Sequence, residues 1–475
     1  MAESLKNKTV NGVAWSGVER FSVQGIQFIV TLVIARILSP KEYGLIGMLA
    51  IFLGVAQSLI DSGFSQALIR KQNRTEVDNS TVFYFNIIAS FIIYAILYII
   101  ASSVASFYRE PELCDILKVL GIVVVINSFA VVQRALFTIH INFKVQTKAT
   151  LVAAILSGGV GIVMALNGLG VWALVYQQIS NAFICTLLLW YYSKWRPAIA
   201  FSRASFCQMF GYGSKLMLSG LINTAYNNIY QITIGKIFNA ASLGYYTRAG
   251  QFAHAPANAF TEVIQRVMFP VMCKIQEDKT KYKEVFSKSL RIAMFLIAPF
   301  MCLMAGISRP MILILLGDKW LYAASLLVPI CFSTMLLPMH ALNLNAITVI
   351  GRSDLFLRVE IYKKIVGVLV MVCAIPLGVL GMCYAGIIGS VVGLLINAQY
   401  SKKEIGYGLV EQLKDISGTM MLSLIVFVTT YFVSRIFPNL WMALISAVLV
   451  GIVLFVSLCY IFKFEELDYL KSIKR

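Results

Sequence analysis

The chain has 475 residues, of which 59% are hydrophobic and 13% charged, and its mean hydropathy is +0.80. A soluble domain is about half apolar and about a quarter charged, so this composition excludes a soluble protein and indicates a membrane protein with many spans. The net charge of +18 would suit nucleic-acid binding in a soluble chain. In a membrane protein it is better explained by basic residues in cytoplasmic loops, and we expect no nucleic-acid partner.

The N-terminal segment MAESLKNKTVNG is polar and no small-residue cleavage site follows it, which does not fit a secretory signal peptide. We therefore expect the first helix to act as its own insertion signal. The nine cysteines lie singly and the three histidines are scattered. This spacing predicts neither a disulfide framework nor a metal site, and we expect no cofactor.

Apolar runs separated by polar or glycine-containing breaks predict an all-α protein with about fourteen transmembrane helices. The loops between them are too short to hold a soluble domain. The predicted helices are residues 11–38, 43–68, 80–106, 115–138, 147–168, 171–194, 208–238, 243–271, 287–308, 321–349, 359–379, 382–400, 416–436 and 441–462.

The first predicted helix carries Glu19 and Arg20 inside its apolar run, with Gln24 one turn later. An ionisable side chain at the centre of a membrane helix costs roughly 2.5–3.5 kcal/mol, so a simple anchor helix would not keep two of them. Either each pairs with a neighbouring helix and pins the bundle, or Arg20 lines a water-filled cavity. In the second case Arg20 is the leading candidate to bind an anionic substrate.

A sequence pattern near the end of this helix returns two hundred residues later. Helices 1 and 7 are six helices apart, so they cross the membrane in the same direction and the two halves are parallel repeats. This predicts a six-helix bundle over residues 1–204, a second over 205–406, and two additional helices with a cytoplasmic tail over 407–475. The matched positions are Ile34 and Ile234, Arg36 and Lys236, Ile37 and Ile237, Gly44 and Gly244, and Phe52 and Phe252.

The distribution of lysine and arginine predicts the orientation of the chain. With the N-terminus inside, the cytoplasmic segments hold 30 of these residues and the opposite side holds 9. Cytoplasmic loops carry the excess of positive charge, so both termini are predicted to lie in the cytoplasm.

Further candidates for a substrate path lie on helices 7 and 8. Asn223, Asn227 and Tyr230 form an unusually polar run that suits sugar hydroxyls, although such residues also join helices to one another. Arg248 and Arg266 could contact an anionic group. Alternatively, Arg248 is an interfacial anchor and Arg266 forms an ion pair with Glu262 on the same helix.

Helix 10 adds polar residues at His340, Asn343 and Asn345. The acids that could bind a coupling proton or Na⁺ are Glu19, Asp61 and Glu262, and nothing in their spacing selects one of them.

Three motifs carry a resemblance to a known family: ARILSPKEYGLIGM (35–48), GYYTRAGQF (244–252) and LGDKW (316–320). Together they resemble the bacterial polysaccharide-transport flippases of the MOP superfamily, especially the colanic-acid-type branch that moves lipid-linked oligosaccharides and O-antigen units. The similarity extends over essentially the whole chain.

The resemblance implies a V-shaped transporter of two bundles without an ATPase domain. It implies transport of an undecaprenyl-diphosphate-linked oligosaccharide from the cytoplasmic to the periplasmic leaflet of the bacterial inner membrane, by alternating access. The products would be surface polysaccharides such as lipopolysaccharide or exopolysaccharide. A polysaccharide polymerase and a chain-length regulator would be partners besides the membrane lipids.

Two other functions stay open at this point. A multidrug or cation exporter of the related extrusion type would need acidic rather than basic residues in its cavity. A membrane enzyme such as an oligosaccharide polymerase would need a large outer loop or an acidic metal cluster, and no DxD, HExxH or Walker motif is present. We therefore expect a transporter and not an enzyme, with no catalytic residues.

Overall fold

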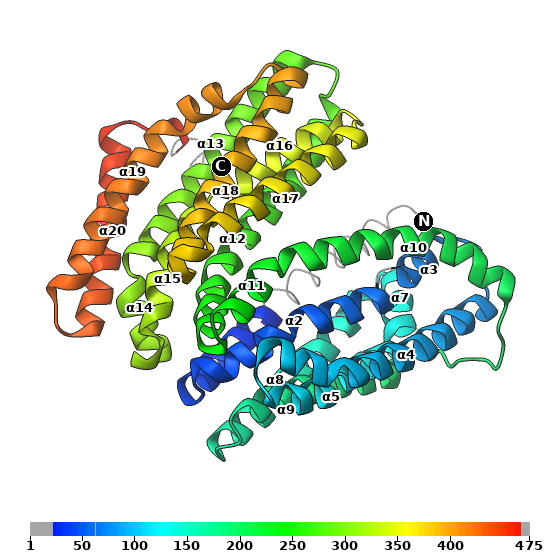
Figure 1. Ribbon diagram of the computed structural model, residues 1–475. Helices are drawn as coiled ribbons and strands as arrows, with labels where there is room; N and C mark the ends of the chain where they lie inside the picture. Colours follow the sequence, from blue (N-terminus) through cyan, green and yellow to red (C-terminus); the bar gives the residue numbers. More distant parts are fainter. Residues whose placement is uncertain (1–21, 62, 467–475) are drawn as a thin grey trace. The chain divides into compact units, whose positions relative to one another are not determined.

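The computed structural model describes residues 22–61 and 63–466, and these residues form helices joined by short turns (Figure 1). The chain divides into two compact units, residues 1–244 and residues 245–475. These units are defined by contacts within the fold, whereas the repeats over 1–204 and 205–406 are defined by sequence. The repeat boundaries therefore stay a prediction.

Unit 1 begins, in its described part, with the helix Ser22–Ile37. Two long helices, α8 and α9, pack along each other in this unit, and α10 packs on α2 and α3. Its further helices are α2 (Pro40–Asp61), α3 (Phe64–Arg70), α4 (Glu76–Tyr108), α5 (Glu112–Leu120), α6 (Ile122–Ser128), α7 (Val131–Ile139), α8 (Phe143–Leu166), α9 (Val171–Tyr192), α10 (Arg203–Asn227) and α11 (Ile229–Ile237).

Helix α12 (Ala240–Lys274) begins in unit 1 and continues into unit 2. In unit 2, α13 packs along α19, and α18 contacts α15, α16 and α17. The helices of this unit are α13 (Lys279–Gly306), α14 (Ser308–Leu316), η1 (Asp318–Trp320), α15 (Leu321–Thr334), α16 (Leu337–Val349), α17 (Ser353–Ala374), η2 (Ile375–Leu377), α18 (Gly378–Ile405), α19 (Leu409–Ile436) and α20 (Leu440–Ile461).

The all-helical fold class is confirmed, while the count of fourteen spans stays a prediction. Ten helices within residues 22–61 and 63–466 are long and apolar enough to cross a membrane, and one of them, Asp354–Ile405, runs 52 residues over α17 and α18. About 20 residues suffice for one crossing, so this segment is long enough for two. The predicted helices 7 and 8 are present as α10–α11 and α12 but are too polar to meet the same criterion.

The helices extend beyond the apolar runs that predicted them. Helix α13 begins at Lys279 instead of residue 287, and α19 begins at Leu409 instead of residue 416. The added turns carry charged residues that hydropathy excludes from a span, but a helix can continue into water with such residues on its surface.

Several predicted breaks are turns in which glycine has a left-handed backbone. Gly168, Gly317, Gly351 and Gly378 have φ values between 76° and 93°. An L-residue with a side chain adopts this region at a cost, so glycine ends each helix without strain.

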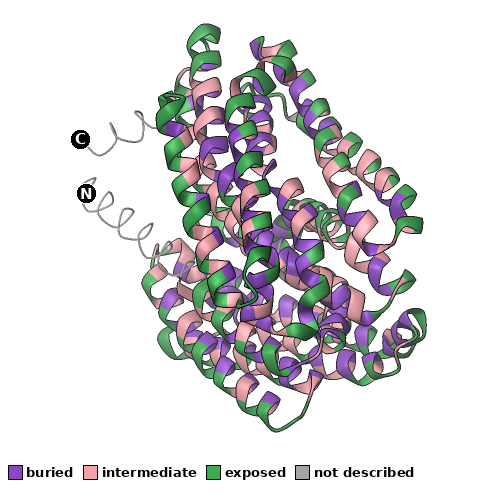
Figure 2. Ribbon diagram, turned by 90° about the vertical axis from the view of Figure 1, so that its left-hand side faces the viewer, coloured by how far each residue is buried: buried purple, intermediate pink, exposed green. Residues whose placement is uncertain are grey.

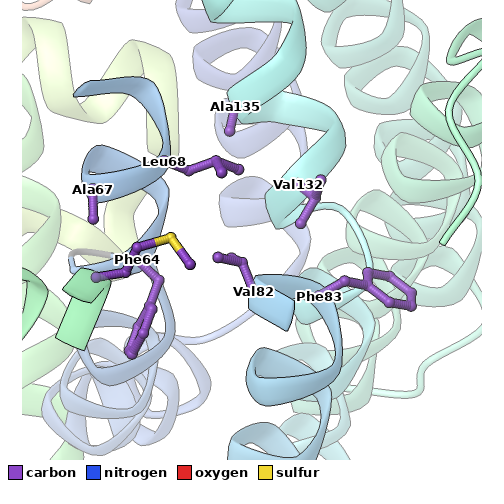
Figure 3. Packing of buried hydrophobic residues seen from close by; sticks show 8 residues of the cluster. Phe64, Ala67, Leu68, Val82, Phe83, Val132 and Ala135 are labelled. Atoms are coloured by element: carbon purple, nitrogen blue, oxygen red, sulfur yellow. The ribbon is translucent and has the colours of Figure 1, made fainter. Parts of the chain in front are cut away.

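The interior of unit 1 contains a hydrophobic cluster between α3, α4 and α7, shown in Figure 3. Phe64, Leu68, Val82 and Val132 meet there and are almost fully buried. Exposed residues lie along many of the helices (Figure 2). Large apolar side chains are among them, for example Ile99 at 75% and Trp441 at 61%. Exposed apolar faces of this extent suit contact with lipid acyl chains.

Candidate functional site

Two of the predicted site residues, Glu19 and Arg20, lie outside the described residues, and their roles stay predictions. Asp61 is the last residue of α2, and its side chain is not among those described. Gln24 lies on the helix Ser22–Ile37 and is exposed.

The polar run on α10 presents two different faces. The Thr224 hydroxyl lies 2.9 Å from that of Ser58 on α2, so this residue joins two helices. Asn223 and Asn227 are exposed and lie four residues apart, on one face of α10, while Tyr230 on α11 is half-buried. The sequence left two roles open for this run, joining helices and contacting sugar hydroxyls. Thr224 joins helices, and the two asparagines are exposed, as contact with a sugar would require.

The candidate residues of unit 2 are spread along α12. The helix continues without interruption across Pro256, and Arg248 donates from Nη1 to Oε1 of Gln251 at 2.5 Å. Arg266 is exposed and lies eighteen residues further on, which corresponds to about 27 Å of helical rise. Arg248 and Arg266 therefore cannot bind the same phosphate group at one time, although both could contact a substrate at different stages of its passage.

The polar residues of α16 are largely engaged within unit 2. His340 Nε2 lies 3.0 Å from the Ser390 hydroxyl, and Asn397 Nδ2 lies 3.1 Å from His340 Nδ1. The buried Asn343 exchanges two hydrogen bonds with Gln412, at 3.0 and 2.9 Å. These groups join α16 to α18 and α19.

One half-buried charged pair in unit 2 was missed by the sequence interpretation. Lys363 and Glu360 on α17 form an ion pair at 2.5 Å, with 17% and 25% of their side chains exposed. Opposite charges three residues apart in the charged first half of α17, which also carries Arg358 and Lys364, were the signal that could have identified this pair.

Within residues 22–61 and 63–466, no group of three or more histidine, cysteine, aspartate or glutamate side chains is arranged to hold an ion. The cations and amides listed above are instead the chemistry that binds phosphate and sugar hydroxyls.

Comparison with known proteins identifies the family. The model of a family described as polysaccharide biosynthesis protein matches residues 33–325, which is more than half of the chain. The lipopolysaccharide biosynthesis protein WzxC of Escherichia coli K12 is 24% identical, over 83% of this chain and 79% of the relative. The succinoglycan biosynthesis transport protein ExoT of Rhizobium meliloti is also 24% identical, over 68% of this chain and 66% of the relative.

Among solved structures, the lipid II flippase MurJ in an inward closed conformation has the same fold. The TM-score is 0.76 at 14% sequence identity, covering 95% of this chain and 98% of the flippase. The resemblance to polysaccharide-transport proteins that the three motifs indicated is confirmed at the level of the family. The chain belongs to the polysaccharide biosynthesis protein family and is a multi-pass membrane protein.

Proposed function

We propose that this protein is a flippase that moves an undecaprenyl-diphosphate-linked oligosaccharide from the cytoplasmic to the periplasmic leaflet for surface polysaccharide synthesis. The observation that carries the proposal is the family match over residues 33–325 in a chain made of membrane-length helices. The relatives named for lipopolysaccharide biosynthesis and succinoglycan transport support a saccharide cargo. They favour this function over the multidrug exporter and over the polymerase, and the protein is accordingly a transporter and not an enzyme.

The membrane is the bacterial inner membrane, and both termini lie in the cytoplasm. The threefold excess of basic residues on one side supports this orientation. The polysaccharide polymerase and the chain-length regulator are the partners that would receive the product.

Alternating access would use the two parallel repeats, and a contact in unit 1 supports the repeat. A Cβ on Gly44 would overlap the backbone of Ala240, and a Cβ on Gly244 would overlap the backbone of Pro40. Residues 44 and 244 are repeat mates, and so are residues 40 and 240. The two contacts are therefore the same contact with the two repeats exchanged. Such a reciprocal contact is expected where two equivalent helices cross.

In this proposal the diphosphate passes along cations and the sugars contact amides and hydroxyls. Arg20, Arg248 and Arg266 would contact the diphosphate in turn, and the distance between the last two suits successive stages. The sugar contacts would be made by Gln24, Asn223, Asn227 and Tyr230. Ion coupling, if the transporter uses it, would involve Glu19, Asp61 or Glu262.

The test is translocation by the purified protein in liposomes that contain a fluorescent undecaprenyl-diphosphate oligosaccharide. A membrane-impermeant glycosidase reports which leaflet holds the sugar. We expect the wild type to equalise the two leaflets, Arg20→Ala to abolish this activity, and Arg20→Lys to retain part of it because the charge is kept. Protein-free liposomes are the control. Equal glycosidase access in liposomes with and without protein would refute the function, and normal transport by Arg20→Ala would remove Arg20 from the path.

A further inference from the structure

A polar cavity opens at one end of unit 1, where α3 ends and α10 begins. Its volume is about 440 Å³, which lies within the range of sites for small ligands. Arginine, lysine, amide and tyrosine side chains line it: Arg70, Lys71, Gln72, Asn73, Gln208 and Tyr212. The positive-inside prediction assigns this end to the cytoplasm.

The Arg70 guanidinium is held against the wall of this cavity by an aromatic ring. Its central carbon lies 4.6 Å from the centroid of the Tyr212 ring, which is a cation–π contact. The stacked arrangement leaves the in-plane N–H donors of the guanidinium available to another group, and planar N–H donors match the oxygens of a phosphate.

Two described acids of α4, Asp78 and Glu76, are engaged with other partners. Asp78 accepts a hydrogen bond from Lys71 Nζ at 2.8 Å and another from the Thr75 backbone. Glu76 accepts from Trp195 Nε1 at 2.6 Å. Within the described residues neither Arg70 nor Arg74 forms an ion pair, and Nη1 of Arg74 is buried without a hydrogen-bond partner.

The walls of the cavity are held in place by close packing. Gly63, just before α3, and Gly213 on α10 approach so closely that a Cβ on Gly63 would lie 2.5 Å from the Gly213 carbonyl oxygen. Ala67 and Met209 belong both to the cavity lining and to the hydrophobic cluster of Figure 3. A site on such a rigid support holds its polar groups in position before the ligand arrives.

We propose that this cavity is a loading site for the diphosphate and first sugar of a lipid-linked oligosaccharide at the cytoplasmic leaflet, an inference that rests on the proposed function. Arg70 donates to the diphosphate oxygens, and Arg74, which follows the lining residue Asn73, adds positive charge. Gln72, Asn73 and Gln208 donate to and accept from sugar hydroxyls, and the Tyr212 ring supports Arg70. The prenyl chain stays in the surrounding lipid.

A second cavity, of about 480 Å³ in unit 2, makes a useful contrast. It also has an arginine over a tyrosine, with the Arg435 guanidinium carbon 3.6 Å from the Tyr431 ring centroid. The rest of its lining is mainly apolar, for example Leu321, Leu380 and Phe432, and no asparagine or glutamine is present among its lining residues. Its larger apolar share and its lack of side-chain amides make it less suited to a sugar, and for this reason the inference is confined to the cavity in unit 1.

The experiment measures binding of undecaprenyl diphosphate to the full-length protein in phosphatidylcholine nanodiscs. Phosphatidylglycerol at the same molar fraction is the second arm, because both lipids present an anionic phosphate. We expect Arg70→Gln to weaken undecaprenyl diphosphate binding about tenfold or more, since a hydrogen bond to a charged group is lost. Tyr212→Leu should weaken it less, because the arginine remains but is no longer held.

The matched control is Arg352→Gln, which removes an exposed arginine that is paired with Asp354 at the start of α17 in unit 2. Wild-type affinity in this control, together with the loss in Arg70→Gln, supports the loading site. Unchanged binding by Arg70→Gln in a protein that elutes and melts as the wild type overturns it. Equal affinity for phosphatidylglycerol overturns it too, because the cavity would then hold an ordinary lipid headgroup. The liposome assay with the wild-type protein tests the transport function separately. Transport by the wild type together with unchanged binding by Arg70→Gln would overturn this site but not the proposed function.

Discussion

The two units differ in how their glycines approach neighbouring helices. In unit 1 backbones approach directly, at Gly44 with Ala240 and at Gly63 with Gly213. In unit 2 the comparable glycine, Gly306, faces a side chain, that of Thr430. The interior of unit 2 also holds an amide and imidazole network around Asn343 and His340.

Both arrangements answer the same physical problem. Lipid tails are as apolar as leucine, so helices in a membrane associate through close packing or through hydrogen bonds between them. The difference has a consequence for function. Polar side chains join helices in both units, as Ser58 and Thr224 do in unit 1, but unit 1 also has the candidate residues Asn223, Asn227 and Arg70 at exposed positions. We infer that unit 1 offers the more adaptable surface for a polar substrate.

The largest effect should come from blocking the backbone approach in unit 1. Gly44→Ala places a methyl group against the Ala240 backbone, which cannot rotate away as a flexible side chain could. Overpacking costs about 1–3 kcal/mol, and contact with backbone puts the expected loss at the upper end. A lower melting temperature in detergent and reduced yield of monodisperse protein would show it.

The control for this prediction is Gly159→Ala on α8, where a Cβ would meet no other atom within 4 Å. This variant should keep or slightly raise stability, because alanine has a higher helix propensity than glycine. If both variants melted alike, the close crossing at Gly44 would not be a stabilising contact.

A smaller effect is expected from the amide pair in unit 2. Gln412→Leu removes one hydrogen bond from each side-chain polar atom of the buried Asn343. Asn343 keeps its bonds to the Met339 carbonyl and from the Ser401 hydroxyl. Each lost bond costs about 0.5–1.5 kcal/mol, which thermal unfolding of the purified variant would detect.

The double variant Asn343→Leu with Gln412→Leu sharpens this prediction. Two apolar residues leave no unpaired amide, so the double variant should be less destabilised than the sum of the single variants. Strict additivity would mean that the two amides contribute independently, against the network that we describe.

The smallest effect on stability is expected from removing an exposed ion pair. Glu284 and Lys288 form an ion pair at 2.7 Å on α13, with 61% and 40% of their side chains exposed. Water and salt screen such a pair, so Glu284→Gln should leave the melting temperature within the error of the measurement. A clear loss of stability would show that exposed charges matter more in unit 2 than its buried amides.

The positions of most helices follow from hydropathy because each span must be apolar over the thickness of the membrane. The helix ends were less accurate, as at Lys279 and Leu409, because charged first turns extend outside the apolar run. The break at Gly63 was not predicted. Gly63 lies against Gly213, which is 150 residues away in the sequence.

The candidate site divides in the same way. Residue types along the chain were sufficient to predict an all-helical membrane protein and, through its motifs, a polysaccharide flippase, since composition and local motifs are properties of the sequence alone. Whether a polar residue joins two helices or remains accessible depends on its partner. Asn343 is paired by Gln412 and Arg70 is held by Tyr212. Only the tertiary structure brings such distant residues together, because helix packing and not sequence separation determines which side chains meet.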